Sequence, residues 1–397
     1  MEIERMINTM FMDKMAPGIL RLSVMDNDID LFEGQYPVPD GVSYNSYLIE
    51  DEQLCLLDTV DARKQDEWLG GLNEALDGRK LDYLVISHME PDHAANIENF
   101  MKAYPDTTVV ANTKTFTMMG NFFRNLNLDG KKLVVANGDS LTLGKHVLTF
   151  VFAPMVHWPE VMVEYEKSEK ILFSADGFGK FGALDADEDW TCEARRYYFN
   201  IVGKYGAQVQ ALLKKAATLD IQTICPLHGP ILKENLGYYI GKYMTWSSYE
   251  PEDDGVLVAY ASIHGNTKTA AEKMKEILEA KGAKKVAITD LSRDDMAEAI
   301  EDAFRYDKLV LAAASYDASV FPCMETFLNK LTNKNYQNRK IAIIENGSWA
   351  PTAARVMKGY VEKMKKITLC EKTVTIKSTM KDADVTAMEE LADELLA

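Results

Sequence analysis

Cysteine is scarce in this chain of 397 residues, and no two cysteines form a C-x-x-C pair. The five cysteines are Cys55, Cys192, Cys225, Cys323 and Cys370. Five scattered cysteines argue against a disulfide framework, and the absence of a C-x-x-C pair argues against a rubredoxin-type iron centre. We therefore expect reduced thiols in a cytoplasmic protein.

Long apolar runs and excess positive charge are also missing. No apolar stretch is long enough to cross a bilayer, and residues 1–21 mix acids with bases, so we expect neither a membrane span nor a signal peptide. The chain has 44 Lys and Arg residues and 61 Asp and Glu residues, which gives a formal net charge of -17. Such an acidic surface argues against binding to nucleic acid or to an anionic membrane.

A change of composition divides the chain. Residues 247–254 read SSYEPEDD, a polar and acidic stretch that contains a proline. A chain of this length is expected to form two domains. We place the first domain at residues 1–250 and the second at residues 254–397.

The most informative stretch of the first domain is ISHMEPDHA, at residues 86–94. The apolar run at residues 81–86 predicts a buried strand, and residues 94–102 have helical character. The loop between them carries four potential metal ligands: His88, Glu90, Asp92 and His93. Imidazole and carboxylate groups together suit divalent iron, zinc or manganese. A polar turn with a capping aspartate would explain one of these residues but not all of them.

Three further candidate ligands each follow a strand-like run. His157 follows residues 147–153, Asp176 follows residues 170–174, and His228 follows residues 221–225. Each of them alone would be an ordinary polar residue. If the strands end at one edge of a common fold, however, the side chains converge there, because loops on a rigid scaffold are where sites are built.

The rest of the first domain gives simpler predictions. The predicted strands cover residues 18–24, 44–49 and 54–58, and the predicted helices cover residues 63–76 and 192–217. His146 begins a strand and is expected to be exposed. Trp158 and Tyr198 are either pocket-lining residues or ordinary core.

The spacing His88-x-Glu90-x-Asp92-His93, followed by His157, Asp176 and His228, resembles the ligand set of the metallo-β-lactamase superfold. Its hydrolases carry histidine where Glu90 stands, and the glutamate is similar to that of the flavodiiron proteins. The resemblance implies an αββα sandwich with two non-haem iron ions. One ion would be held by His88, Glu90 and His157, the other by Asp92, His93 and His228, with Asp176 between them. A carboxylate in place of imidazole favours the ferric state, which suits a redox cycle.

Strands and helices alternate in the second domain. The predicted strands cover residues 256–261, 286–288, 308–312, 340–345 and 373–377. The predicted helices cover residues 268–280, 296–305, 324–331, 353–365 and 383–396. This order predicts a doubly wound parallel sheet of the flavodoxin-like type.

Three loops of this domain stand where ligands bind in such sheets, at the carboxyl ends of strands. The first loop opens a helix and offers hydroxyl, amide and free N–H groups, so it predicts a phosphate cradle that is neither a Walker loop nor G-x-G-x-x-G. The candidate residues are Ser262, Ile263, His264, Gly265, Asn266 and Thr267 in the first loop, Ser315, Tyr316, Asp317 and Ala318 in the second, and Asn346, Gly347, Ser348 and Trp349 in the third. Tyr316 and Trp349 would either stack on a ligand or pack in the core. The resemblance to flavodoxins and to the flavin domain of flavodiiron proteins implies that these loops bind FMN.

A metal domain followed by a flavin domain resembles the flavodiiron proteins over essentially the whole chain. The resemblance implies an oxidoreductase that uses electrons from FMN to reduce dioxygen to water or nitric oxide to nitrous oxide, in detoxification of either gas. It also implies an external electron donor, rubredoxin or a reduced deazaflavin, and a head-to-tail homodimer or a tetramer. Two alternatives stay open: a dinuclear zinc hydrolase with a flavodoxin-like appendage, and an electron carrier whose metal domain is structural.

Overall fold

The computed structural model describes residues 10–397, which form two compact units. The first unit contains the described residues up to Tyr197 together with Ala207–Tyr243, and the second contains Tyr198–Gly206 and Met244–Ala397. Residues 1–9 lie outside the described residues. They belong to residues 1–21, in which we expect no signal peptide. None of the helices in the described part of the chain has the length and apolar character that a membrane span requires.

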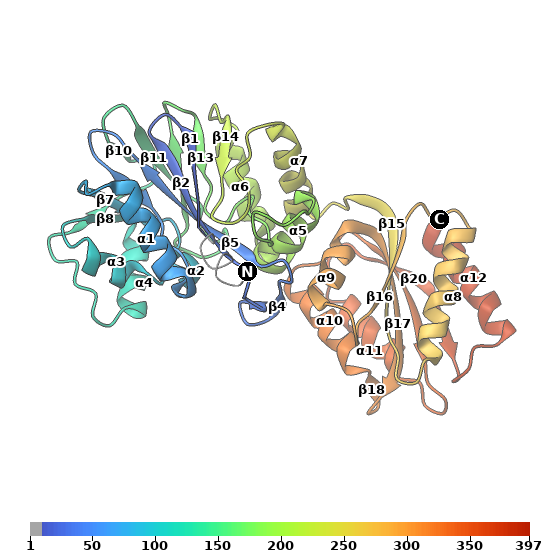
Figure 1. Cartoon of the computed structure of the whole chain (residues 1–397). Helices are drawn as coiled ribbons and strands as arrows, with labels where there is room; N and C mark the ends of the chain where they lie inside the picture. The colour runs from blue at the N-terminus through green and yellow to red at the C-terminus, as the bar shows by residue number, and fades with distance from the viewer. Residues whose placement is uncertain (1–9) are drawn as a thin grey trace. The chain divides into compact units, whose positions relative to one another are not determined.

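The first unit is built on two sheets (Figure 1). The larger sheet has the order β1 (Met10–Ala16), β2 (Ile19–Asp26), β5 (Val42–Ile49), β6 (Cys55–Leu57), β7 (Tyr83–Val85), β8 (Thr108–Ala111), β9 (Lys132–Val134). The smaller sheet has the order β10 (Ser140–Thr142), β11 (Val147–Phe152), β12 (Met162–Glu166), β13 (Ile171–Phe173), β14 (Thr223–Cys225). A short hairpin joins β3 (Leu31–Phe32) to β4 (Tyr36–Pro37). All eight residues of β5 are buried, as expected for a strand in the middle of a covered sheet.

Helices complete the predicted αββα sandwich, which is confirmed. They are α1 (Gln65–Leu76), α2 (Pro91–Ala94), α3 (Ile97–Ala103), α4 (Thr113–Phe122), α5 (Trp190–Tyr197), α6 (Gly206–Ala216) and α7 (Leu236–Ser247). Helix α1 packs on β1 and β2 of the larger sheet. Leu213 of α6 and Ile240 of α7 line one small cavity with Leu172 of β13 and Ile224 of β14, so these helices cover the smaller sheet.

Strand direction places the candidate ligands at common edges. Strands β6, β7 and β8 are parallel in the larger sheet. In the smaller sheet β11 and β13 are both antiparallel to β12, and β13 is parallel to β14. Strands β11, β13 and β14 therefore run the same way, so the loops that follow them, which carry His157, Asp176 and His228, leave the sheet at one edge.

The predicted helix over residues 192–217 is present, but it is not a regular α-helix along its length. Helix α5 continues into a π-helix (Tyr198–Val202) and a 3-10 helix (Gly203–Tyr205), and α6 begins at Gly206. The reason is tertiary packing within the second unit, since the ring of Phe199 stacks on Phe304 at 4.2 Å between centroids. Helical periodicity in the sequence does not register such a competing contact.

The prediction that His146 is exposed is also wrong. The side chain is buried, and its Nδ1 lies 2.8 Å from Oδ2 of Asp51. The same carboxylate oxygen accepts the backbone N–H of His146 at 2.7 Å, and Nε2 of the ring lies 3.1 Å from the carbonyl oxygen of Pro17. These partners are distant in sequence, so the histidine secures a loop rather than facing solvent.

The second unit is a parallel sheet in the order β16 (Val286–Asp290), β15 (Asp253–Ala261), β17 (Tyr306–Tyr316), β19 (Lys340–Asn346), β20 (Thr368–Ile376). The short strand β18 (Ser319–Val320) pairs antiparallel with β17. Its helices are α8 (Asn266–Ala280), α9 (Met296–Arg305), α10 (Pro322–Asn333), α11 (Ala353–Val361) and α12 (Asp382–Leu396). In chain order the parallel strands read 2-1-3-4-5, so the predicted flavodoxin-like sheet is confirmed.

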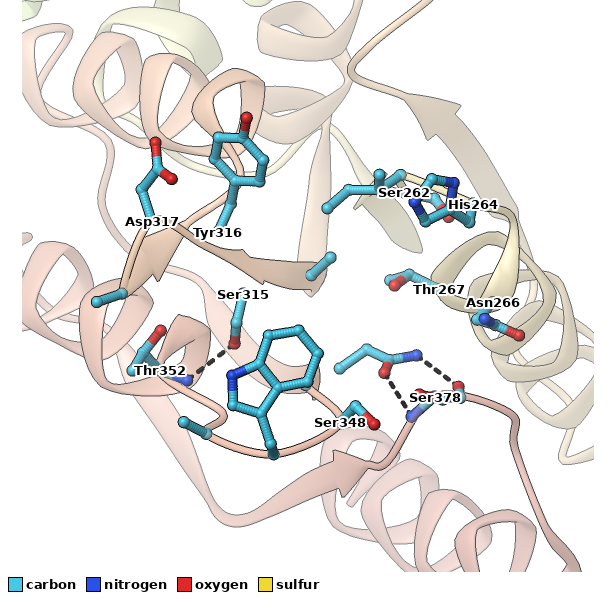
Figure 2. A pocket seen from close by; sticks show the side chains of 17 residues that line it. Ser262, His264, Asn266, Thr267, Ser315, Tyr316, Asp317, Ser348, Thr352 and Ser378 are labelled. Atoms are coloured by element: carbon cyan, nitrogen blue, oxygen red, sulfur yellow. Dashed lines mark hydrogen bonds between the residues drawn. The ribbon is translucent and has the colours of Figure 1, made fainter.

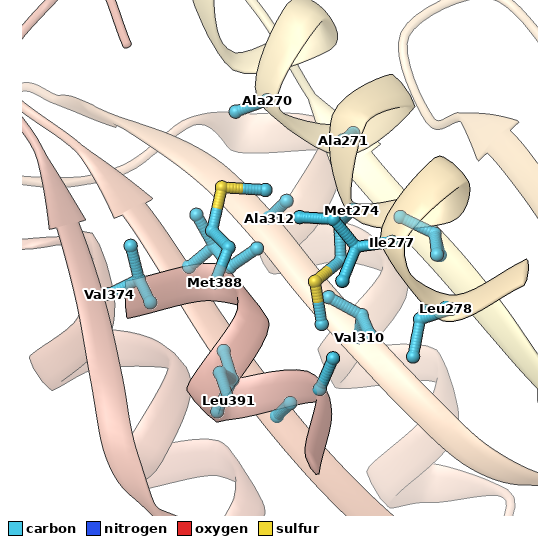
Figure 3. Close-up of a cluster of buried hydrophobic side chains, with 14 of the residues drawn as sticks. Ala270, Ala271, Met274, Ile277, Leu278, Val310, Ala312, Val374, Met388 and Leu391 are labelled. Atoms are coloured by element: carbon cyan, nitrogen blue, oxygen red, sulfur yellow. The ribbon is translucent and has the colours of Figure 1, made fainter. Parts of the chain in front are cut away.

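One face of this sheet is covered by α8 and α12 (Figure 1). Figure 3 shows Met274 and Leu278 of α8 and Leu391 of α12 meeting over Val310 and Ala312 of β17, and all five side chains are buried. Small alanines on the strand leave room for the larger side chains of the helices. This core fixes the ends of the strands, from which the three candidate loops extend.

We expect Leu391→Ala to lower the free energy of unfolding of the second unit by about 2–5 kcal/mol, because the substitution leaves a cavity in a close-packed core. Urea unfolding of the full chain measures the change. Thr386→Ala, an exposed position on the same helix, serves as the control and should change stability by about 0.5 kcal/mol or less. Equal midpoints for the two variants would contradict this description of the core.

Candidate functional site

The loop between β7 and α2 presents the first group of candidate ligands. Glu90 has an extended backbone, and Pro91 occupies the first position of α2, where its missing N–H costs nothing. The N–H groups of His93 and Ala94 both donate to the carbonyl oxygen of Glu90 at 2.9 Å. The strand end and the helix start thereby hold Glu90, Asp92 and His93 within one turn, and all three are buried.

One cluster joins this loop to the two loops after β11 and β13. Nε2 of His157 lies 3.0 Å from Oε2 of Glu90 and 2.9 Å from Oδ2 of Asp176. Nε2 of His88 lies 3.3 Å and 3.2 Å from the same two oxygens. These four side chains are buried, and their ligand atoms lie within 4.8 Å of one another.

A second cluster lies on the other side of Asp176. Nε2 of His93 is 3.3 Å from Oδ2 of Asp92 and 3.1 Å from Oδ1 of Asp176. Nε2 of His228 is 3.1 Å from Oδ2 of Asp92 and 3.8 Å from Oδ1 of Asp176. Asp176 thus directs one carboxylate oxygen to each cluster, which is the arrangement of a carboxylate that bridges two cations. The structure brings all seven predicted residues together.

Several polar atoms of this centre have no hydrogen-bond partner in the described part of the chain. They are both carboxylate oxygens of Asp92, Oδ1 of Asp176 and Nδ1 of His93, and all are buried. Nδ1 of His228 lies 2.9 Å from the carbonyl oxygen of Ser43, which can only accept, so the proton is on Nδ1. The bare Nε2 of His228 then lies 3.0 Å from Nε2 of His93. Buried polar atoms without partners are costly, and a cation would satisfy the three carboxylate oxygens.

The electrostatics of the centre also favour a cation. Burial would raise the pKa of Asp176, but the imidazoles of His88 and His93 hold it well below its usual range. Burial, with help from Glu90 and Asp176, raises the pKa of Asp92 to about 7. Burial alone would lower the pKa of His157, yet Asp176 and Glu90 raise it to about 9. His157 thus takes up a proton only to balance the buried carboxylates, and a metal ion would take over that role. Four imidazoles and three carboxylates, without thiolate, are a donor set that fits non-haem iron.

Aromatic rings surround part of the centre. Ring centroids of Phe32, Tyr44 and Tyr197 lie 5.6, 5.7 and 5.5 Å from that of His228. The ring of Trp158, which is half-buried, stands perpendicular to that of His88 at 5.4 Å. Of the two aromatic residues left open by the sequence, Trp158 therefore lies at the cluster. Tyr198 is buried in the second unit, where it packs against Phe199 and Trp246.

The second unit contains a cavity of about 540 Å³ at the carboxyl ends of its strands, shown in Figure 2. Its lining includes every predicted flavin residue except Gly265, together with Ala314 and Ala350 of the same loops. Thr352 and Ser378 also line it, and sequence reasoning missed both. Gly265 precedes α8 with φ +92°, a conformation that favours glycine. Trp349 is 92% exposed and Tyr316 is 44% exposed, so neither ring is core.

Hydrogen bonds fix the loops around this cavity (Figure 2). Oγ of Ser315 accepts the backbone N–H of Thr352 at 2.8 Å, which ties the second loop to the third. The side-chain amide of Asn346 donates to the carbonyl oxygen of Ser378 at 2.8 Å and accepts its N–H at 3.0 Å. Helix α8 begins at Asn266 on the cavity wall, so its amino end provides a site for a phosphate. Cavity size, phosphate site and exposed aromatic rings fit FMN.

Comparison with known families agrees with this division of the chain. Residues 42–229 match the family described as ODP family beta lactamase. Residues 257–381 match the family described as flavodoxin domain.

Whole proteins similar to this chain also span both units. An uncharacterized protein of Methanocaldococcus jannaschii is 33% identical over 286 residues, which cover 70% of this chain and 72% of that protein. A nitric oxide reductase of Moorella thermoacetica is 27% identical over 390 residues, 96% of this chain and 97% of the relative. The solved structure of rubredoxin oxygen:oxidoreductase from Desulfovibrio gigas superposes with a TM-score of 0.91 at 25% identity, and covers 97% of this chain and 98% of its own.

Proposed function

Because this chain belongs to the flavodiiron protein family, and therefore carries FMN and a non-haem diiron site, we propose that it reduces dioxygen to water or nitric oxide to nitrous oxide. The observation that carries the proposal is the carboxylate of Asp176, which directs one oxygen to each of two buried His and carboxylate clusters. Such a pair of adjacent sites suits two metal ions that act on one small molecule.

We assign the metal ligands by cluster. His88, Glu90 and His157 would hold one iron, Asp92, His93 and His228 would hold the other, and Asp176 would bridge them. Bound iron supplies the electrons and the open coordination positions that reduction of a diatomic gas requires. Glu90 adds a negative charge that an imidazole at this position would lack. That charge stabilises the ferric state and so supports a redox role over hydrolysis.

The residues around the ligands control access and hydrogen bonding. The rings of Phe32, Tyr44 and Tyr197 cover the His228 side, and their burial excludes bulk water from that side. The hydroxyl groups of Tyr44 and Tyr197 are buried and have no hydrogen-bond partner within the described residues. They are therefore free to donate to a polar group in the centre. A small, uncharged gas is the class of substrate that such an enclosed site admits.

The second unit holds the electron carrier. The amino end of α8 with Ser262, Asn266 and Thr267 would bind the FMN phosphate, and Tyr316 and Trp349 would contact the ring. The hydrogen bond from the backbone N–H of Thr352 to Oγ of Ser315 would hold the loop that carries Trp349 in place. We further propose that the chain works in the cytoplasm as a head-to-tail homodimer or a tetramer. Rubredoxin or a reduced deazaflavin would deliver the electrons.

Gas consumption tests this function directly. The protein, loaded with FMN and iron, is supplied with reduced rubredoxin or a photoreduced deazaflavin, and uptake of dioxygen or nitric oxide is followed in separate runs. We expect rapid uptake of at least one gas. The product should be water, not hydrogen peroxide, if the gas is dioxygen, and nitrous oxide if the gas is nitric oxide. The gas with the higher kcat/KM is the substrate. Uptake no faster than that of an iron-stripped sample, with both gases, would contradict the proposal.

A further inference from the structure

The imidazole of His88 is held from both sides. Its Nε2 faces Glu90 and Asp176 at 3.3 and 3.2 Å. Its Nδ1 lies 2.9 Å from Oε1 of Glu160, a side chain that is only 2% exposed. Glu160 follows His157 by three residues on the loop after β11, so one loop supplies a candidate ligand and also contacts a ligand from the other sheet.

The carboxylate of Glu160 is itself fixed in place. Its Oε1 also accepts the backbone N–H of Met89 at 2.8 Å, which ties it to the main chain beside His88. The backbone carbonyl oxygen of Glu160 accepts a hydrogen bond from the side-chain amide of Asn112 at 2.6 Å. The other end of that amide, Oδ1 of Asn112, accepts N–H groups of Lys114 and Thr115 in the first turn of α4. Glu160 is therefore part of a rigid frame rather than a movable side chain.

One histidine of each cluster has a hydrogen-bond partner on its far nitrogen, and the two partners differ in charge. Behind His228 is a neutral acceptor, the carbonyl oxygen of Ser43 at 2.9 Å. Behind His88 is the carboxylate of Glu160. A carboxylate bonded to the far nitrogen of a metal-binding histidine fixes the tautomer and ring orientation and makes the ligand more basic. The ring of Trp158, perpendicular to that of His88, restricts the remaining rotation.

We propose that Glu160 is a positioning residue that keeps the proton of His88 on Nδ1 and directs its bare Nε2 at the metal position shared with Glu90 and Asp176. This inference rests on the proposed function of the cluster as a metal centre. It implies that His88 is a ligand in the resting chain and that the two metal positions are unequal. The position on the His88 side depends on Glu160, and the position on the His228 side does not.

Cobalt binding tests the inference without any assay of gas reduction. Metal-stripped full-length chain with FMN bound is dialysed against Co²⁺ under anaerobic conditions, and bound metal and the visible cobalt bands are measured. For Glu160→Ala we expect one of two cobalt ions to bind about 10–100-fold more weakly, with the second unchanged. For Glu160→Gln, which keeps an acceptor but removes the charge, we expect a smaller loss and altered bands.

Two comparisons separate positioning from general damage. Glu166→Gln alters another buried carboxylate, at the end of β12, which accepts hydrogen bonds from backbone N–H groups and from Ser168. It should leave both cobalt affinities unchanged. In a His88→Ala background, Glu160→Ala should cause no further loss of cobalt, because its partner is already gone. Wild-type binding in Glu160→Ala, or an equal loss in the His88→Ala background, would overturn the inference. A wild-type chain that binds no cobalt would instead overturn the proposed function itself.

Discussion

Replacing Asp176 with alanine should leave the chain with little or no iron while FMN stays bound. One oxygen of this carboxylate serves each cluster, so its removal affects both metal positions together. Even a change outside the ligand shell typically costs 10–100-fold in metal affinity or activity, so we expect turnover to fall by more than about 100-fold. Iron per chain, flavin per chain and gas uptake are the three quantities to measure.

The matched control is Asp187→Ala, an exposed aspartate on the segment after the same strand. It removes the same carboxylate at a position that contacts neither cluster, and it should keep both iron and turnover. Loss of FMN together with iron in Asp176→Ala would indicate a folding defect rather than loss of a ligand. Full iron content with normal turnover would show that Asp176 does not bridge the two sites.

Thr267→Asp should abolish tight binding of FMN. Thr267 is buried in the first turn of α8 and lines the cavity, so an aspartate there places a negative charge beside the proposed phosphate position. Two unit charges about 4 Å apart repel by about 4 kcal/mol at an effective dielectric constant of 20. Since about 1.4 kcal/mol corresponds to a factor of ten, the dissociation constant should rise by about two to three orders of magnitude.

Fluorescence titration of the flavin-stripped chain with FMN measures this change. Thr269→Asp is the control, because it introduces the same charge on the same helix at an exposed position that does not line the cavity. An acidic residue near the amino end of a helix is favourable by itself, so the control should fold and bind FMN normally. Equal affinities in the two variants would place the phosphate elsewhere. Iron content should be unchanged in both.

Much of the candidate centre could be predicted because its residues follow strands directly. His157, Asp176 and His228 each come shortly after an apolar run, and such runs are visible without any knowledge of the fold. The direction of the strands, which the sequence does not state, is what brings these loops to one edge. The parallel sheet of the second unit was likewise predictable, because strands and helices alternate along that part of the chain with little interruption.

The errors and omissions share a physical cause, which is contact between residues distant in sequence. Glu160 has no distinctive spacing, and its role depends on His88, which is 72 residues away. The burial of His146 depends on Asp51, 95 residues away. Ser378 follows the last strand and carries no recognisable motif, yet Asn346 binds it into the cavity wall. The π-helical stretch after α5 carries Phe199, whose packing on Phe304 periodicity cannot register.

Reoxidation of the flavin in a stopped-flow experiment tests the central claim most directly. The chain is prepared with FMN and either iron or zinc, reduced without oxygen, and mixed with dioxygen or nitric oxide. We expect the iron-loaded protein to be reoxidised by one of the gases far faster than the zinc-loaded protein, because electrons leave FMN through the His and carboxylate centre. Equal rates for iron and zinc with both gases would contradict this account and would favour a hydrolytic zinc site beside an independent flavin domain.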